Sequence, residues 1–328
     1  MDLVDITTWS SFETKEIAIS QIFLDAPLKL TVREFTPMDG DMLEETWKSG
    51  DSTIVHSLPR YAIVEMNEAA CTIGSFIDKS IGAYITAMVD GPDNLLWCTY
   101  MMAFKQVSTA QTVEEQILLR DCFRLWVSCL MTSYPNHIVG HERLGSDKIR
   151  DPLSQHFGMT PIPLLMVAQM ECIHYTKFLR PLSKKVLDSL QDLVLSSKKR
   201  QKAWFTIYLT LFVLLHGCAL VTRRDAETAT QYGLTPYANP KSIQAHQSGA
   251  QTMLAHWHYV DKGLKPFQMA LTSEGLKEVA KRANLNPEQT DLVRTTATWI
   301  RDQGKRNISF CADYGAPRLS FQVPQYRP

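Results

Sequence analysis

The sequence lacks an excess of charge of either sign, and it is not rich in glycine or proline. Its 328 residues include 34 lysines and arginines and 34 aspartates and glutamates, so its formal net charge is zero. A domain that holds nucleic acid unaided is typically basic. The 15 glycines and 16 prolines exclude a collagen-like or low-complexity chain. The composition therefore predicts a globular protein that does not bind nucleic acid by itself.

Cysteine pairs and glycine-rich loops are also missing. The seven cysteines are scattered, and no two form a Cys-x-x-Cys pair. They predict neither a disulfide framework nor a zinc module. No phosphate-binding glycine motif occurs, so we expect neither a metal nor a nucleotide cofactor. The first residues, MDLVD, do not resemble a secretory signal. We therefore expect an intracellular protein, in the nucleus or the cytoplasm.

One apolar run is nearly long enough to cross a membrane. Residues 204–221 read WFTIYLTLFVLLHGCALV, and a bilayer core takes about 20 residues of helix. Thr206, Thr210 and His216 interrupt the run, and basic residues on both flanks give it no orientation. The central helix of a large helical protein is also apolar all round. We predict a core helix and no membrane association.

The first 58 residues differ in pattern from the rest. Leu28, Leu30 and Val32 alternate with polar residues, which favours a half-buried strand. Residues 38–41, Met-Asp-Gly-Asp, are typical of a turn. One or two short strands cannot bury a core alone. We therefore expect residues 1–58 to form an extended arm that packs on the body.

Helical patterns dominate from Pro59 onward. We expect helices over about 59–89, over 93–104 with Asp93 as the cap, and from Thr112 onward, where Thr112 and Glu115 form a capping box. Two further helices lie on either side of Pro181, and the second of them reaches Ser197. The apolar run forms a helix that extends to Tyr232, and the last two helices cover 240–263 and 287–304. Residues 133–163 form a long irregular connection, a kind that is often functional or mobile. The expected fold is mainly α: a multi-helix orthogonal bundle (59–306), with a short extended or β N-terminal arm and an irregular C-terminal tail (307–328).

Four strings in register carry a family resemblance. They are RLWVSCLM (124–131), PLSKKVLDSLQDLVL (181–195), WFTIYLTLFVLLHGCALVTRRDAETATQYGL (204–234) and LAHWHYVDKGLKPF (254–267). Together they resemble the regulatory region of fungal binuclear-zinc-cluster transcription factors. The resemblance implies a mostly helical region involved in effector response, self-association or inhibition. The six-cysteine DNA-binding head of that family has no counterpart in this sequence.

The histidines and one carboxylate are the candidates for acid–base chemistry: His174, His216, Asp225, His256 and His258. A buried His216 needs a hydrogen-bond partner, and a structural role is the simpler interpretation. His256 and His258 are two residues apart, so on a helix they point about 200° apart and cannot share a metal. Glu171 and His174 have i, i+3 spacing and share a helical face. We expect that pair to serve a surface or interhelical hydrogen bond.

Aromatic residues and a histidine gather in the strings that carry the resemblance. If their helices pack together, they line an apolar small-molecule pocket; the alternative is a well-packed core. The candidate pocket residues are Trp204, Tyr208, Phe212, His216, Trp257 and Tyr259.

Two functional hypotheses follow. The first is a transcription-factor-like regulatory protein without its own DNA-binding domain, acting through a small-molecule effector, a protein partner or a homodimer, with fungal secondary metabolism as a setting. The alternative is a small-molecule biosynthetic enzyme that has reused the helical regulatory fold. The sequence favours the first, because it offers no nucleophile motif such as Gly-x-Ser-x-Gly.

Overall fold

The computed structural model describes residues 8–314 except 22, 90, 93 and 261–265, and the side chains of 197, 198, 235, 238, 256, 258–260 and 304–314 also lie outside the description. By its internal contacts the chain divides into two compact units that interleave along the sequence. Unit 1 comprises residues 1–88, 123–185 and 221–243, and unit 2 comprises 89–122, 186–220 and 244–328. The division expected from the sequence, into 1–58, 59–306 and 307–328, stays a prediction.

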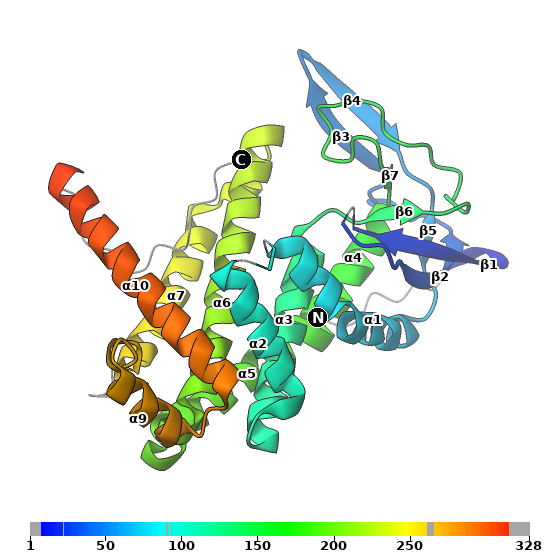
Figure 1. The fold of residues 1–328 in the computed structure, drawn as a ribbon. Helices are drawn as coiled ribbons and strands as arrows, with labels where there is room; N and C mark the ends of the chain where they lie inside the picture. Colours follow the sequence, from blue (N-terminus) through cyan, green and yellow to red (C-terminus); the bar gives the residue numbers. More distant parts are fainter. Residues whose placement is uncertain (1–7, 22, 90, 93, 261–265, 315–328) are drawn as a thin grey trace. The chain divides into compact units, whose positions relative to one another are not determined.

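A five-stranded antiparallel sheet belongs to unit 1 (Figure 1). Its strand order is β5-β2-β1-β6-β7, built from β1 (Trp9–Ser20), β2 (Leu28–Phe35), β5 (Tyr61–Ile63), β6 (His137–Val139) and β7 (Thr160–Pro161). The strand expected from alternation is confirmed, since Leu28, Leu30 and Val32 are buried while Lys29 and Thr31 are exposed. Period-two burial of apolar side chains thus gives β2 its inner face.

The N-terminal arm holds more strands than the one or two expected. A hairpin of β3 (Glu44–Ser49) and β4 (Ser52–Ser57) forms a separate two-stranded sheet. Neither of its strands has a fully buried residue, so the sequence shows no hydrophobic alternation there. The turn at 38–41 is confirmed: the amide of Asp41 donates to the carbonyl of Met38 over 3.1 Å, and Gly40 has a φ of 99°.

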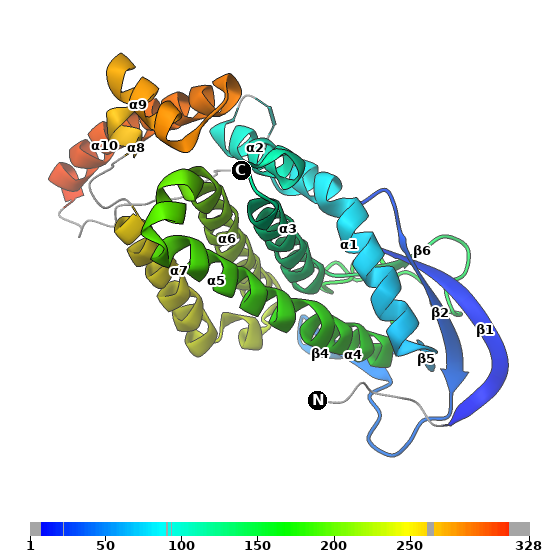
Figure 2. The same cartoon turned by 90° about the horizontal axis from the view of Figure 1, so that it is seen from below.

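The first helix begins later than expected. Residues 61–63 pair with β2 as β5, and α1 runs over Met66–Met88. The expected start at Pro59 is wrong because sheet pairing, which is non-local, competes with the helical pattern. Within unit 1, α1 packs on β2, and α4 (Leu164–Ile173) packs on β5 (Figure 2). Gln169 fastens α4 to the sheet edge: its Oε1 accepts from the amide of Ile63 over 2.7 Å.

Pro181 does not separate two helices, which corrects a second expectation. α4 continues through the π-helical segment η1 (His174–Leu179) into α5 (Arg180–Leu195). The amide of Arg180 donates to the carbonyl of Tyr175, five residues back. A proline inside a helix has no amide hydrogen and crowds the preceding turn. The wider π turn comes just before Pro181, and we infer that it lets the helix continue from α4 into α5 without a break.

Local start signals located two further helices well. α3 (Val113–Ser133) begins as the Thr112–Glu115 pair predicted, with the Glu115 amide donating to Thr112 Oγ1 over 3.2 Å. α2 (Leu95–Thr109) is capped by Asn94, whose Oδ1 accepts from the amide of Leu96, so the expected cap was one residue early. Asp93 lies outside the described residues.

The apolar run forms the middle of α6 (Ser197–Tyr232), which ends before Gly233 as expected. Its segment Lys199–Tyr232 is long and apolar enough to cross a membrane by length and composition, and it is the one such helix among the described residues. Of its most apolar window, 56% is buried inside the protein. Core helices of soluble proteins pass the same test, so we retain the core interpretation as a prediction.

The remaining helices are η2 (Thr235–Ala238), α7 (Pro240–Val260), α8 (Pro266–Met269), α9 (Ser273–Ala283) and α10 (Pro287–Tyr314). Asn239 and Asn286 cap α7 and α10 as expected, through Oδ1. Figure 1 shows α9 beside α10 in unit 2. α10 continues ten residues past the expected end at Gly304, so the irregular tail is wrong for 307–314. A mainly helical fold with an N-terminal sheet is confirmed, and the orthogonal arrangement stays a prediction.

Candidate ligand site

A cavity of about 260 Å³ lies in unit 1. Its walls come from β3, the end of α3, the 133–163 connection, α4 with η1, and the last third of α6. Met131, Ile162, Val167 and Met170 form an apolar side. The polar lining residues include Glu45, His156, Glu171, His174, Arg224, Thr228 and Tyr237. The cavity thus offers hydrocarbon on one side and several polar groups that could orient a bound small molecule.

His174 is the most unusual residue of this cavity. It is the first residue of η1 and only 2% exposed, yet neither ring nitrogen has a hydrogen-bond partner among the described residues. Burial lowers the pKa of His174 from 6.5 to about 4. Near neutral pH the ring is therefore uncharged, with one N–H donor and one nitrogen acceptor. Unpaired buried polar atoms destabilise a fold, so each one requires an explanation.

Glu45 and His156 form a hydrogen-bonded pair on another wall. His156 Nε2 lies 3.1 Å from Glu45 Oε1, and Gln155 Nε2 donates to the same oxygen over 3.3 Å. Burial raises the pKa of Glu45, but the hydrogen bond and charge of His156 outweigh it, and the pKa lies below its ordinary value. The Glu45 carboxylate is thus ionised and already hydrogen-bonded to His156 and Gln155. His156 Nδ1 is buried without a hydrogen-bond partner in the described part of the chain.

Arg224 brings a fixed positive charge to the cavity. Its guanidinium carbon lies 5.2 Å from the centre of the Tyr134 ring, a cation–π contact that orients the side chain. Arg224 Nε is buried, and within the described residues it has no hydrogen-bond partner. The pKa of Tyr237 is raised by burial and by the nearby carboxylates of Glu171 and Asp225. Tyr237 therefore presents a neutral hydroxyl.

Gln21 holds the α3 wall in place. Its amide nitrogen donates to the carbonyls of Leu130, Met131 and Tyr134, which close the end of α3. Tyr84 Oη in turn donates to Gln21 Oε1 over 2.7 Å. The carbonyl of Leu130 also accepts from the amide of Tyr134, and that of Met131 from Asn136 Nδ2, so Gln21 adds to the hydrogen bonds at this helix end. The network therefore fixes the backbone that carries Met131 and Tyr134.

Contacts from β3 hold the 133–163 connection. Trp47 Nε1 donates to Asp151 Oδ2 over 2.7 Å, and Glu45 binds His156 and Gln155. The long connection thus contributes His156 to the cavity from a fixed position. Its irregular pattern was the sequence signal for this part of the site.

Sequence reasoning identified His174 but not its surroundings. Glu171 and His174 both line the cavity, although Glu171 is exposed and His174 is buried. The hydrogen bond expected for the pair is not seen for His174, whose ring nitrogens are unpartnered among the described groups. Glu45, His156 and Arg224 were missed. Arg224 lay within a string that carried the family resemblance, which was the available signal.

The aromatic residues expected to line a pocket contact one another in unit 2. The Tyr208 ring centre lies 5.9 Å from that of Phe212, 6.0 Å from that of Trp257 and 5.0 Å from that of Phe267. Trp204 is 1% exposed and meets Phe267 edge-on. We call Trp204, Tyr208, Phe212, Trp257 and Phe267 the ring cluster. These contacts are typical of core packing, and the pocket stays a prediction.

His216 is buried beside this cluster and has a partner. Its Nδ1 lies 2.8 Å from Tyr100 Oη, the hydrogen bond that a buried structural histidine requires. Burial raises the pKa of Tyr100, so its hydroxyl stays neutral. Asp225 is half-buried on α6. The backbones of His256, His258 and Tyr259 lie in α7, and their side chains are outside the described set.

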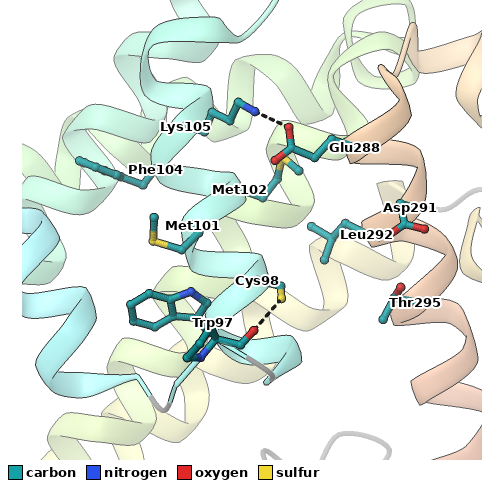
Figure 3. A pocket seen from close by; sticks show the side chains of 11 residues that line it. Trp97, Cys98, Met101, Met102, Phe104, Lys105, Glu288, Asp291, Leu292 and Thr295 are labelled. Atoms are coloured by element: carbon teal, nitrogen blue, oxygen red, sulfur yellow. Dashed lines mark hydrogen bonds and ion pairs between the residues drawn. The ribbon is translucent and has the colours of Figure 1, made fainter.

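A second cavity lies in unit 2, between α2 and α10 (Figure 3). Trp97, Met101, Met102 and Leu292 make it largely apolar, and the Lys105–Glu288 ion pair spans it. Its polar side chains are exposed, and no residue of this cavity has a buried unpartnered polar atom in the described structure. It therefore lacks the feature that distinguishes the His174 cavity. Among the described residues, no three His, Cys, Asp or Glu side chains gather to hold a metal ion.

Comparisons with known proteins give one family. No curated protein and no solved structure matches the chain. The model of the KpeA transcription factor family matches residues 1–312. This supports the expectation of a transcription-factor-like protein, whereas the resemblance to the zinc-cluster regulatory region is not confirmed and stays a prediction. Because the match covers nearly the whole sequence, the chain belongs to the KpeA transcription factor family.

Proposed function

We propose that this protein regulates transcription by binding a small-molecule effector in the His174 cavity, without contacting nucleic acid itself. The observation that carries the proposal is the buried His174 side chain, which lines a cavity with neither ring nitrogen hydrogen-bonded to a described residue. A ligand that pairs with these atoms removes a desolvation penalty, so binding is coupled to the stability of unit 1.

Charge and family support the two other parts of the proposal. The formal net charge of zero gives no net electrostatic attraction to a polyanion. Membership of a transcription factor family supports a regulatory role and a nuclear location. Together they favour a protein that acts on transcription through a partner. Fungal secondary metabolism as the setting stays a prediction.

The test uses the full chain fused to a heterologous DNA-binding domain, with a reporter gene. Fractionated small-molecule extract from the source organism is added, and reporter output is measured for wild type, His174→Leu and His141→Leu. His141 is an exposed histidine of the same unit, so it controls for the chemical change alone. We expect one fraction to alter reporter output for wild type and His141→Leu, and not for His174→Leu.

Two results would reject the proposal. If no fraction changes the output of the wild-type fusion, or if His174→Leu responds as wild type does, the effector part is wrong. If the purified chain alone binds a specific DNA sequence tightly at physiological salt, the indirect mode of action is wrong.

A second candidate function, acid–base catalysis, is favoured by one observation. Glu45 binds His156 Nε2, and His156, whose Nδ1 is buried without a partner among the described residues, lines the same cavity as His174. A carboxylate that orients a histidine is a common arrangement for proton transfer. Mass spectrometry of the active fraction, before and after incubation with the protein, distinguishes the two. Conversion that stops in His156→Gln supports an enzyme, and an unchanged ligand supports a sensor.

A further inference from the structure

The unpaired polar atoms of the His174 cavity indicate what kind of molecule fits there. Three residues that line it carry four buried nitrogens without hydrogen-bond partners among the described residues: both ring nitrogens of His174, Nδ1 of His156 and Nε of Arg224. Arg224 Nε can only donate. Neutral His174 donates once and accepts once. A ligand that satisfies them must therefore supply both acceptor and donor groups.

The charge of Arg224 indicates which acceptor group the ligand carries. The Glu45 carboxylate is paired with His156 and Gln155, and Glu171 is exposed. Arg224 is always charged, and Tyr134 holds its guanidinium by a cation–π contact. Hydrogen bonds between an arginine and a carboxylate are stronger than those between neutral groups. The acceptor that suits Arg224 best is a carboxylate.

The volume of the cavity and its apolar side chains limit the size and chemistry of the rest of the ligand. A volume of about 260 Å³ is below the ~300–1,000 Å³ of pockets for drug-sized ligands. Ile162, Val167 and Met170 present hydrocarbon to the cavity. The ligand is therefore small, with a hydrocarbon part that meets these three side chains.

We infer that the His174 cavity binds a small hydroxylated carboxylic acid, whose carboxylate pairs with Arg224 and whose hydroxyl exchanges hydrogen bonds with His174. The inference rests on the proposed function in that it names the class of the effector. It does not depend on whether binding changes transcription. The two statements therefore fail under different results.

The experiment is a titration of the purified full chain with four matched probes, measured by calorimetry and thermal unfolding. The probes are 4-hydroxybenzoate, benzoate without the hydroxyl, 4-hydroxybenzyl alcohol without the charge, and 4-hydroxybenzylamine with the opposite charge. We expect 4-hydroxybenzoate to bind about tenfold or more tightly than each of the others, because each loses one hydrogen bond to a buried group. Inorganic phosphate serves as a test for an unspecific anion site.

Variants assign the preference to particular atoms. Arg224→Gln should reduce binding of the acid about tenfold and leave the alcohol nearly unchanged. Arg224→Lys retains the positive charge but lacks the Nε–H donor. It takes the place of Arg224→Gln in the experiment if the glutamine variant fails to fold. His174→Leu should abolish the advantage of the hydroxylated acid over benzoate. His141→Leu should match wild type throughout.

His174→Leu also separates a ligand-binding role from a structural one. With no ligand present, the substitution removes unpaired buried polar atoms, so the melting temperature should rise by about 2–4 °C. A histidine that supports the fold would give a lower melting temperature instead.

Three results would overturn the inference: the amine or phosphate binds as tightly as the hydroxy acid, Arg224→Gln keeps the preference for the acid, or His174→Leu melts lower and still binds. If the acid binds as expected but the reporter does not respond, the proposed function fails and the inference stands. If His174→Leu alters the reporter response but no acid binds, the inference fails and the proposed function stands.

Discussion

Two buried histidines of this protein differ in one respect that decides their interpretation. His216 lies in unit 2 beside the ring cluster, and Tyr100 Oη is 2.8 Å from its Nδ1. His174 lies in unit 1 against a cavity, and the described residues offer its ring nitrogens no hydrogen bond. Both were acid–base candidates by residue type. The hydrogen-bond partner, and not burial, distinguishes a structural histidine from a candidate ligand-binding one.

The surroundings of the two histidines also differ, although Trp204 Nε1 in the ring cluster is itself buried without a hydrogen-bond partner among the described residues. Around His216 the contacts described are ring on ring, with centroid separations such as 5.4 Å to Tyr100 and 5.0 Å between Tyr208 and Phe267. Around His174 the wall mixes hydrocarbon with a hydrogen-bonded carboxylate–imidazole pair and a guanidinium. Packed rings stabilise the fold without a ligand, whereas unpaired polar groups are stabilised by one.

The largest expected effect is at the ring cluster. Trp204→Ala removes a 1%-exposed indole that packs on Phe205 and Phe267. We expect a loss of about 3–5 kcal/mol in the free energy of unfolding, measured by urea denaturation. A loss below about 1 kcal/mol would show that the site collapses easily or is already open, which would favour the pocket interpretation.

The second effect is on the pH dependence of stability. The folded-state pKa of His174 is about 4 against an ordinary value of 6.5. Between those values the unfolded chain binds a proton that the folded chain does not, so the free energy of unfolding falls as the pH is lowered from 6.5 toward 4. The full difference is on the order of 3 kcal/mol. Urea unfolding across this interval measures it.

The control for the acid effect is the same titration of His174→Leu. Its free energy of unfolding should fall less steeply over this interval, because the variant has no imidazole to protonate at position 174. Equal slopes for the two proteins would mean that His174 reaches solvent or a partner in solution, and the contrast with His216 would be lost.

The helix starts and strand β2 show which features of the fold the sequence can predict. Helix starts were found because their signals are local: Thr112 meets Glu115, and Asn286 meets Gln289, within a single turn. β2 was found from alternation within eight residues. The start of α1 was misplaced because β5 forms only by pairing with β2, a partner about thirty positions earlier.

The candidate site lay beyond such signals. His174 was named from its i, i+3 relation to Glu171, yet its lack of a partner is a property of the folded chain. Glu45, His156 and Arg224 come from three segments more than sixty residues apart. No periodicity or short motif links positions so distant, since only tertiary packing brings them to one cavity. Their residue types alone are those of ordinary surface residues.

The third effect tests the partner of His216. Tyr100→Phe keeps the ring contacts but removes the hydroxyl, so His216 Nδ1 loses that hydrogen bond. We expect a loss of about 1–3 kcal/mol in the free energy of unfolding, because the group left behind is buried. Tyr175→Phe, at a tyrosine that is 52% exposed, should change stability little. Equal effects of the two substitutions would remove the structural assignment of His216.

The smallest effect is expected at the second cavity, where the ion pair is exposed. Lys105 and Glu288 join α2 to α10 with side chains 51% and 56% exposed. Water screens such pairs and ordering the two long side chains costs entropy, so Glu288→Gln should lower the free energy of unfolding by only about 0–1 kcal/mol. Added salt should shrink even that difference, because about 1 M salt reduces the Debye length to about 3 Å. A salt-independent loss above about 2 kcal/mol would instead mean that the pair is shielded from water in solution. The groove between α2 and α10 would then hold buried polar groups as the His174 cavity does, and the distinction between the two cavities would no longer stand.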